Sequence, residues 1–125
     1  MDHLTGTMQV LVYTPADKIN AQTSFYESLL GIPPYYSWYE STTDCGAKFR
    51  IGSSALVILC QDHPMALGPV ALNIECNDVE AFYARTKELM PEQVLTSPLI
   101  KPYGTHCFAI RDPLCNLINI YANGH

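Results

Sequence analysis

The sequence has little charge and no basic stretch. Only 15% of its 125 residues are charged, and 7 Lys and Arg residues against 12 Asp and Glu residues give a formal net charge of -5. A protein that binds nucleic acid neutralises phosphates with clustered Lys and Arg, and the sequence contains no such cluster. The composition therefore argues against a nucleic-acid partner.

Long hydrophobic runs are also missing. The longest apolar run, Ala55–Cys60, is far shorter than the ~20 residues of a membrane-spanning helix. The first residues, Met1–Gly6, lack the charged and apolar regions of a signal peptide. We therefore expect a cytoplasmic protein that has no membrane partner.

Cysteine is present but follows no recognisable spacing. The cysteines are odd in number and scattered, with no CxxC pair, which argues against both a disulfide framework and a zinc site. We expect small buried thiols in a reducing compartment. A GxSxG motif and a Cys-His arrangement are missing too, so no nucleophilic catalysis is indicated. The cysteines are Cys45, Cys60, Cys76, Cys107 and Cys115.

Apolar residues are abundant, at 48% of the sequence. This fraction is enough for one buried core, whereas the chain is too short for two independent domains. We therefore expect residues 1–125 to form a single domain.

Periodicity divides the first half into a strand, a helix and three more strands. Met8–Tyr13 is β-branched and apolar, and Asp17 is placed to cap the helix that follows. Gly31 and the prolines after it end this helix. Its expected core-facing residues are Ala21, Phe25, Tyr26, Leu29 and Leu30. The expected strands run roughly over 35–41, 47–51 and 55–60, with turns at 44–46 and 52–54.

The second half repeats this order. Val70–Glu75 is typical of a strand, Asp78 is placed to cap the next helix, and Pro91 ends that helix. The expected core face holds Val79, Phe82, Tyr83, Thr86, Leu89 and Met90, and the expected strands lie near 93–97, 106–111 and 116–121. Both helices carry a Phe-Tyr pair, which favours an internal duplication. The predicted fold class is α+β, with two βαβββ modules over about residues 8–60 and 70–122.

Two motifs give the sequence a family resemblance. Phe25–Gly31 matches the helix-ending pattern FYxxxLG, and Pro102–Gly104 followed by Phe108–Asn116 matches a PYG…DPxGN turn. With the βαβββ repeat, the sequence resembles the vicinal-oxygen-chelate superfamily of glyoxalases, bleomycin-resistance proteins and extradiol dioxygenases. Cys115 stands where the pattern has glycine, so the turn must accommodate a side chain there.

The resemblance implies that both modules curl a mixed sheet around a cup, with the helices on the outer face. Since side chains alternate between the two faces of a strand, every second residue points into this cup. The expected ligand-binding residues are Gln9, Tyr13, Trp38, Asn73, Glu75, Asn119 and Tyr121.

The resemblance also assigns metal-ligand positions, where this sequence offers few ligands. These positions fall on Gln9, on Val70 or Ala71, among Val57, Ile58 and Leu59, and on Asn119. A catalytic divalent ion is usually held by several imidazole or carboxylate ligands, and this set supplies two amide oxygens at best. We therefore expect neither a metal nor another cofactor. A different metal site that uses Glu75 and His106 is an alternative.

Two functions are compatible with these residues. The first is a metal-free protein that sequesters a small aromatic or cationic compound, with rings of the Tyr35–Tyr39 segment as a clamp. The second is an enzyme of the glyoxalase, isomerase or dioxygenase type, with an atypical metal site or with Glu75 as its catalytic general base. The same rings are also suited to core or interface packing, and Glu75 to a solvated position at the rim. Strand alternation puts Tyr35, Ser37 and Tyr39 on one face and Tyr36 and Trp38 on the other, and we expect at most one of these sets to line a pocket.

We further expect a homodimer. The hydrophobic fraction is high, and Leu4, Trp38 and the strand edges offer apolar surface that needs cover. The sequence leaves open whether the dimer exchanges modules and which compound is bound.

Overall fold

The computed structural model describes residues 3–5, 7–61 and 69–123. The chain divides into two compact units, Met1–Leu67 and Gly68–His125. We call them module one and module two and describe each by itself.

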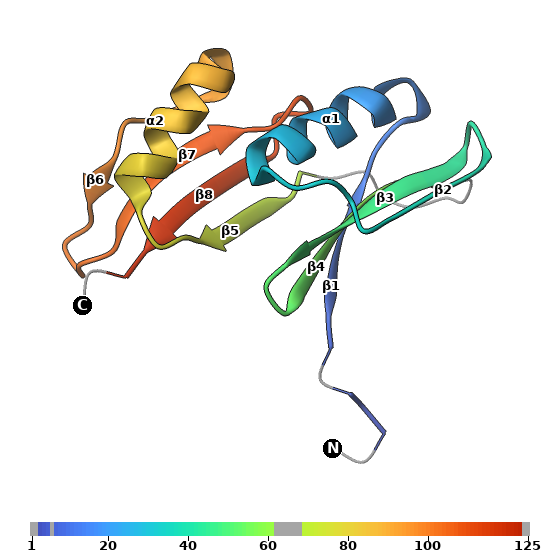
Figure 1. The fold of residues 1–125 in the computed structure, drawn as a ribbon, viewed down its shortest axis with the longest axis horizontal. Helices are drawn as coiled ribbons and strands as arrows, with labels where there is room; N and C mark the ends of the chain where they lie inside the picture. The colour runs from blue at the N-terminus through green and yellow to red at the C-terminus, as the bar shows by residue number, and fades with distance from the viewer. Residues whose placement is uncertain (1–2, 6, 62–68, 124–125) are drawn as a thin grey trace. The chain divides into compact units, whose positions relative to one another are not determined.

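Module one is a four-stranded sheet with one long helix (Figure 1). Its elements are β1 (Gln9–Tyr13), the 3-10 turn η1 (Ala16–Lys18), α1 (Ile19–Leu30), β2 (Tyr36–Ser41), β3 (Asp44–Ile51) and β4 (Ser54–Cys60). The strand order is β1-β4-β3-β2. β1 runs parallel to β4, and the remaining neighbours are antiparallel.

Module two repeats this topology. Its elements are β5 (Ala71–Glu75), α2 (Val79–Leu89), the 3-10 turn η2 (Pro91–Gln93), β6 (Leu99–Ile100), β7 (His106–Arg111) and β8 (Leu117–Ala122). The strand order is β5-β8-β7-β6, again with one parallel pair, β5 and β8. The predicted fold class of two βαβββ modules is confirmed.

Each helix covers one face of its own sheet. In module one, Phe25, Tyr26 and Leu29 of α1 are buried, as are Phe49 of β3 and Ile58 of β4. In module two, Val79 and Thr86 of α2 are buried, and so are the β7 and β8 residues Phe108, Ile110, Ile118 and Ile120. Burying a large aliphatic side chain contributes about 1.5–3 kcal/mol, so these helix-facing rows hold each module together.

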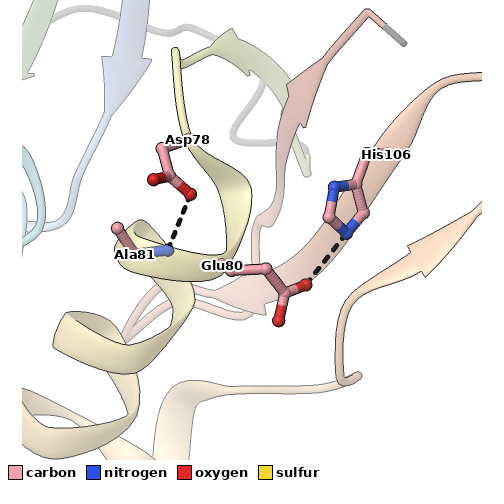
Figure 2. A network of polar contacts seen from close by, with 4 residues as sticks. All are labelled: Asp78, Glu80, Ala81 and His106. Carbon is pink, nitrogen blue, oxygen red and sulfur yellow. Dashed lines mark hydrogen bonds and ion pairs between the residues drawn. The ribbon is translucent and has the colours of Figure 1, made fainter.

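The two helix starts differ from each other. Asp78 caps α2 as predicted, because its Oδ1 accepts a hydrogen bond of 3.1 Å from the backbone N–H of Ala81 (Figure 2). The prediction for Asp17 is wrong: it lies inside the 3-10 turn that follows Pro15, and Lys18 takes the cap position of α1 without a side-chain bond. A 3-10 turn shifts the start of the α-helix beyond the reach of the Asp17 carboxylate.

The buried stripes of the helices also differ from the expectation. Gln22 is fully buried in α1, whereas Ala21 is exposed and Leu30 is half-buried. In α2, Leu89 is exposed because the helix ends there before Pro91. A helical period of 3.6 residues allows two neighbouring stripes, and the rotation of the helix on the sheet selects between them. The end of α1 follows the prediction, with Gly31 at φ 70° and its N–H bonded to the carbonyl of Glu27.

Two of the expected strand boundaries are wrong. Residues 44–46 belong to β3, and the turn before β3 is at 42–43 instead. Residues 93–97 form no strand: η2 takes up Pro91–Gln93, and Val94 makes a single bridge to Ile110. Proline favours the first position of a helical turn and lacks a ladder N–H, so Pro91 starts η2 and Pro98 precedes the two-residue strand β6.

The turn between β7 and β8 is held by one carboxylate. Asp112 Oδ1 accepts bonds of 2.9 Å from the N–H groups of Leu114 and Asn116, and its Oδ2 accepts a bond of 2.8 Å from Asn116 Nδ2. Cys115 lies inside this turn at φ 65°. The expectation that a side chain replaces glycine here is therefore confirmed, at the cost of a left-handed backbone.

The thiols are mostly protected. Cys45, Cys60 and Cys107 are buried, while Cys115 is exposed. Burial raises the pKa of the half-buried Cys76 thiol, and the nearby carboxylates Asp78 and Glu75 raise it further. Because the thiolate is the reactive form, Cys76 is a weak nucleophile at neutral pH.

No helix within residues 7–61 or 69–123 is long and apolar enough to cross a membrane.

We predict that Cys115→Gly increases the free energy of unfolding by about 1 kcal/mol, since glycine adopts the left-handed region without a steric penalty. The matched control is Gly52→Ala. Gly52 has φ 58°, and a Cβ there would meet no atom within 4 Å. Backbone strain alone should therefore reduce the stability of this variant by about the same amount. Urea denaturation measures both changes, and a destabilised Cys115→Gly protein would contradict the prediction.

Candidate functional site

The face of the module-one sheet opposite α1 is hollowed. We call this hollow the first concavity, and its volume is about 400 Å³. Its lining residues are Gln9, Leu11, Tyr36, Trp38, Glu40, Lys48, Val57, Leu59 and Gln61. The strand register explains this set, because Leu11 and Lys48 both pair with Val57, and Tyr36 pairs with Lys48. Paired residues point to the same side of a sheet, so side chains from all four strands gather here.

Trp38 is the most firmly positioned side chain of the first concavity. Its ring stacks on Tyr36, with 6.2 Å between centroids and an interplanar angle of 26°. Its Nε1 donates a hydrogen bond of 3.0 Å to Asp44 Oδ1. A Cβ on Gly46 would lie 2.5 Å from the indole, so the absence of a side chain at Gly46 lets the ring lie against β3. Tyr36, Trp38 and Glu40 line this concavity, whereas Ser37 and Tyr39 line a hollow on the other face of β2. The expectation that at most one face of Tyr35–Tyr39 lines a pocket is therefore wrong.

Charges of both signs flank these rings. Glu40 is exposed at the rim, and Lys48 Nζ lies 5.4 Å from the centroid of the Tyr36 ring. The amides of Gln9 and Gln61 add neutral donors and acceptors. Among the described residues, the first concavity therefore combines flat aromatic surface, the Glu40 carboxylate, the Lys48 ammonium group and hydrogen-bonding amides.

Module two has a hollow on the corresponding face of its own sheet. This second concavity has a volume of about 310 Å³, and its lining is Asn73, Lys101, Tyr103, Thr105, Cys107, Asn119, Tyr121 and Asn123. Asn73 pairs with Asn119, and Tyr121 pairs with Cys107, so the amides and the phenol share one face. Its chemistry differs from that of the first concavity: it is rich in amides, and its one charged side chain is Lys101.

The predicted site residues are distributed over both modules. Gln9 and Trp38 line the first concavity, and Asn73, Asn119 and Tyr121 line the second. Tyr13 is half-buried and Glu75 is exposed, and both lie outside these two linings. A common cavity for all of these residues stays a prediction.

Sequence reasoning missed several lining residues. Lys48 and Glu40 depend on the register of β2 and β3, which the misplaced turn obscured. Lys101 and Tyr103 lie in the loop before β7, beside the PYG motif that was used for the fold alone. Motif positions can thus carry binding residues as well as turn geometry.

The residues at the assigned metal positions do not fit a divalent ion. Gln9 and Asn119 present amides, Val57 faces the first concavity with an apolar side chain, and Ala71 has none to offer. The described residues contain no group of three or more His, Cys, Asp and Glu side chains suited to a metal ion. Such ions in open catalytic sites prefer imidazole and carboxylate ligands.

The alternative metal site is wrong on geometric grounds. Glu75 pairs with Tyr121, which pairs with Cys107, so His106 points to the opposite face of the sheet from Glu75. On that face, His106 Nε2 lies 2.9 Å from Glu80 Oε2 of α2 (Figure 2). Glu75 and His106 therefore cannot share an ion, and His106 serves as a helix-to-sheet contact.

Comparison with known proteins finds matches in structure but none in sequence. No family model and no curated protein matches the sequence. Solved structures, in contrast, match along nearly the whole chain.

Three of these structures illustrate the likeness. A lactoylglutathione lyase from Agrobacterium tumefaciens is 18% identical, with a TM-score of 0.73 over 95% of this chain and 94% of that one. A glyoxalase/bleomycin resistance protein from Catenulispora acidiphila is 19% identical, with a TM-score of 0.68 over 93% and 96%. A glyoxalase/bleomycin resistance protein/dioxygenase from Alicyclobacillus acidocaldarius is 15% identical, with a TM-score of 0.69 over 100% and 96%. The chain therefore has the fold of these glyoxalase/bleomycin-resistance/dioxygenase proteins.

Proposed function

We propose that the protein binds a small organic compound with a flat aromatic or cationic group, and that it does so without a divalent metal. The observation that carries this proposal is the stacked pair of Tyr36 and Trp38 beside Glu40 in the first concavity. A flat ring packs against the indole, while a positive charge on the ligand faces the Glu40 carboxylate. Gln9 and Gln61 orient the polar groups of the ligand.

The magnitudes favour a modest but specific interaction. An aromatic pair contributes about 0.5–1.5 kcal/mol beyond the area that it buries. A cation over a ring contributes about 0.5–2 kcal/mol, depending on how far it is removed from water. Trp38 is already held by Asp44 and by its contact with Gly46, so little side-chain entropy is lost when a ligand stacks on it.

Proteins with this fold include glyoxalase/bleomycin resistance proteins, which supports the binding of an organic compound. The enzymatic alternative has less support from the described residues. Glu75 is exposed, which removes the burial that would tune a general base. The amide and apolar side chains at the metal positions cannot hold the metal ion that serves as the electrophile in lyases and dioxygenases of the vicinal-oxygen-chelate superfamily. A cytoplasmic location is also part of the proposal, consistent with cysteines that form no disulfide among the described residues.

Binding is predicted to quench Trp38, the single tryptophan of the chain. An aminoacridine, which is a planar aromatic cation, should quench its fluorescence saturably, and Tyr36→Ala should weaken binding about tenfold by removing the stacked ring. Tyr35→Ala is the matched control, because Tyr35 lies outside the lining of the first concavity and stacks with Arg50. Equal affinities of the two variants would refute the site.

The metal-free part of the proposal has a separate test. Calorimetry with zinc, nickel and manganese should detect no binding tighter than about millimolar, since two amides make a poor ligand set. Micromolar affinity for one of these metals that is lost in Gln9→Ala or Asn119→Ala would overturn this part. A metal-dependent enzyme would then be the preferred function.

We further propose a homodimer, because apolar side chains are exposed along β1 and before it. Leu4 is 71% exposed and Met8 is 82% exposed, and Val10 and Leu11 of β1 are exposed as well. Light scattering should find twice the chain mass, and Met8→Asp combined with Val10→Asp should return the monomer. A monomeric parent protein at micromolar concentration would contradict the proposal.

A further inference from the structure

We infer that module one carries a second binding site, on the other side of its sheet, for a small uncharged compound. The site is a groove between α1 and the edge strand β2, and we call it the α1 groove. Its volume is about 470 Å³, which lies within the range of small-molecule sites. The lining residues are Ala16, Ile19, Asn20, Thr23, Ser24, Ser37, Trp38, Tyr39, Thr42, Cys45, Gly46 and Ala47.

The strand register explains how the groove forms. Ser37 pairs with Ala47, and Tyr39 pairs with Cys45, so these four side chains share the face that α1 covers. On the helix, the lining residues recur at intervals of three and four from Ala16 to Ser24, which makes one stripe that faces the groove. Ser37, Cys45 and Ala47 are small and leave space beside the helix, and Tyr39 lies at the exposed edge of this space.

Module two shows what the same backbone looks like when this space is filled. The strand pairings show which residues of the two modules correspond. In module one, Gly46 and Tyr13, the last residue of β1, both pair with Leu59. In module two, Cys107 and Glu75, the last residue of β5, both pair with Tyr121. Cys107 is thus the counterpart of Gly46. It follows that His106 is the counterpart of Cys45, and Phe108 the counterpart of Ala47.

The counterparts in module two are large and make contacts with α2. The Phe108 ring lies 5.2 Å from Tyr83 and 6.2 Å from Phe82, centroid to centroid. His106 is paired with Glu80, as Figure 2 shows. When the helices are aligned on their Phe-Tyr pairs, the counterpart of Glu80 is Thr23.

Module one therefore replaces a ring and an ion pair by Ala47, Cys45 and Thr23. Protein interiors are close-packed, and a helix-facing position normally favours a side chain that fills the available volume. At three positions where module two has large side chains, module one has small ones. The difference in volume leaves a hollow that a ligand can occupy.

The lining indicates the class of ligand. Among the described residues, no charged side chain lines the groove, so an ion would find no partner there. The side-chain oxygens and nitrogen of Asn20, Thr23 and Ser24 make no hydrogen bond within residues 7–61, which leaves them available to a ligand. The half-buried Ile19 and Trp38 add apolar surface. A flat neutral compound with one or two hydroxyl or carbonyl groups matches this combination.

The α1 groove and the first concavity lie on opposite faces of one sheet, and Trp38 belongs to both linings. Tryptophan fluorescence alone therefore cannot distinguish them. Amide resonances in two-dimensional NMR can, because Thr23 and Cys45 report on the groove, whereas Gln9 and Lys48 report on the first concavity.

The test uses the full chain and naphthol, a neutral bicyclic compound with one hydroxyl group. Naphthol should shift the amide resonances of Asn20, Thr23 and Cys45 with submillimolar affinity. Ala47→Phe, which copies Phe108 of module two, should weaken the binding at least tenfold. Ser24→Phe tests the same blockage from an exposed position, in case Ala47→Phe does not fold.

Ala21→Phe is the matched control, because Ala21 is exposed on α1 and lies outside the groove lining. It should leave the naphthol affinity unchanged. None of the three variants should affect binding of the aminoacridine in the first concavity. The inference is overturned if naphthol shifts only Gln9 and Lys48, if it shifts no resonance at millimolar concentration, or if a folded Ser24→Phe protein binds it as well as the parent.

Discussion

The packing of one helix against one face of each four-stranded sheet is the constraint on which the molecule depends. Strand alternation sends the apolar residues of β4 and β8 toward the helices, with Ile58 and Ile120 fully buried. The other face is not covered by the helix of its own module and carries polar side chains such as Gln9, Lys48 and Asn119. Both concavities follow from this division, because each lies on the face opposite the helix of its own module.

The two modules use one backbone plan for different chemistry. The first concavity has an indole, a phenol and charges of both signs, whereas the second has three asparagines and a lysine. On the helix-covered faces, the Phe108 ring of module two packs against α2, whereas its counterpart Ala47 in module one lines the α1 groove. A duplicated fold can thus keep its strand register while side-chain size and charge diverge at equivalent positions.

The sequence predicted the elements better than their exact pairing. Gly31 and Asp78 give local signals for a helix end and a helix start, and both were confirmed. Asp17 carried the same local signal and failed, since the 3-10 turn before α1 is a competing local structure. Gln9 and Asn119 could be placed on a concave face by strand alternation together with the family resemblance. Trp38 could not, because alternation left open which face of its strand lines a pocket. Lys48 could not, because its face depends on which residues form the turn before β3.

The anchoring of Trp38 has a consequence for how the whole chain can be studied. Its indole is fixed to β3 by the Asp44 hydrogen bond and the close approach at Gly46, so it has little room to reorient within module one. The decay of its fluorescence anisotropy therefore follows the rotational diffusion of the module itself. A correlation time typical of about half the chain would indicate modules that tumble independently, and a time typical of the full chain would indicate one rigid body. Trp38 is therefore an intrinsic fluorescence probe of whether the two modules move independently.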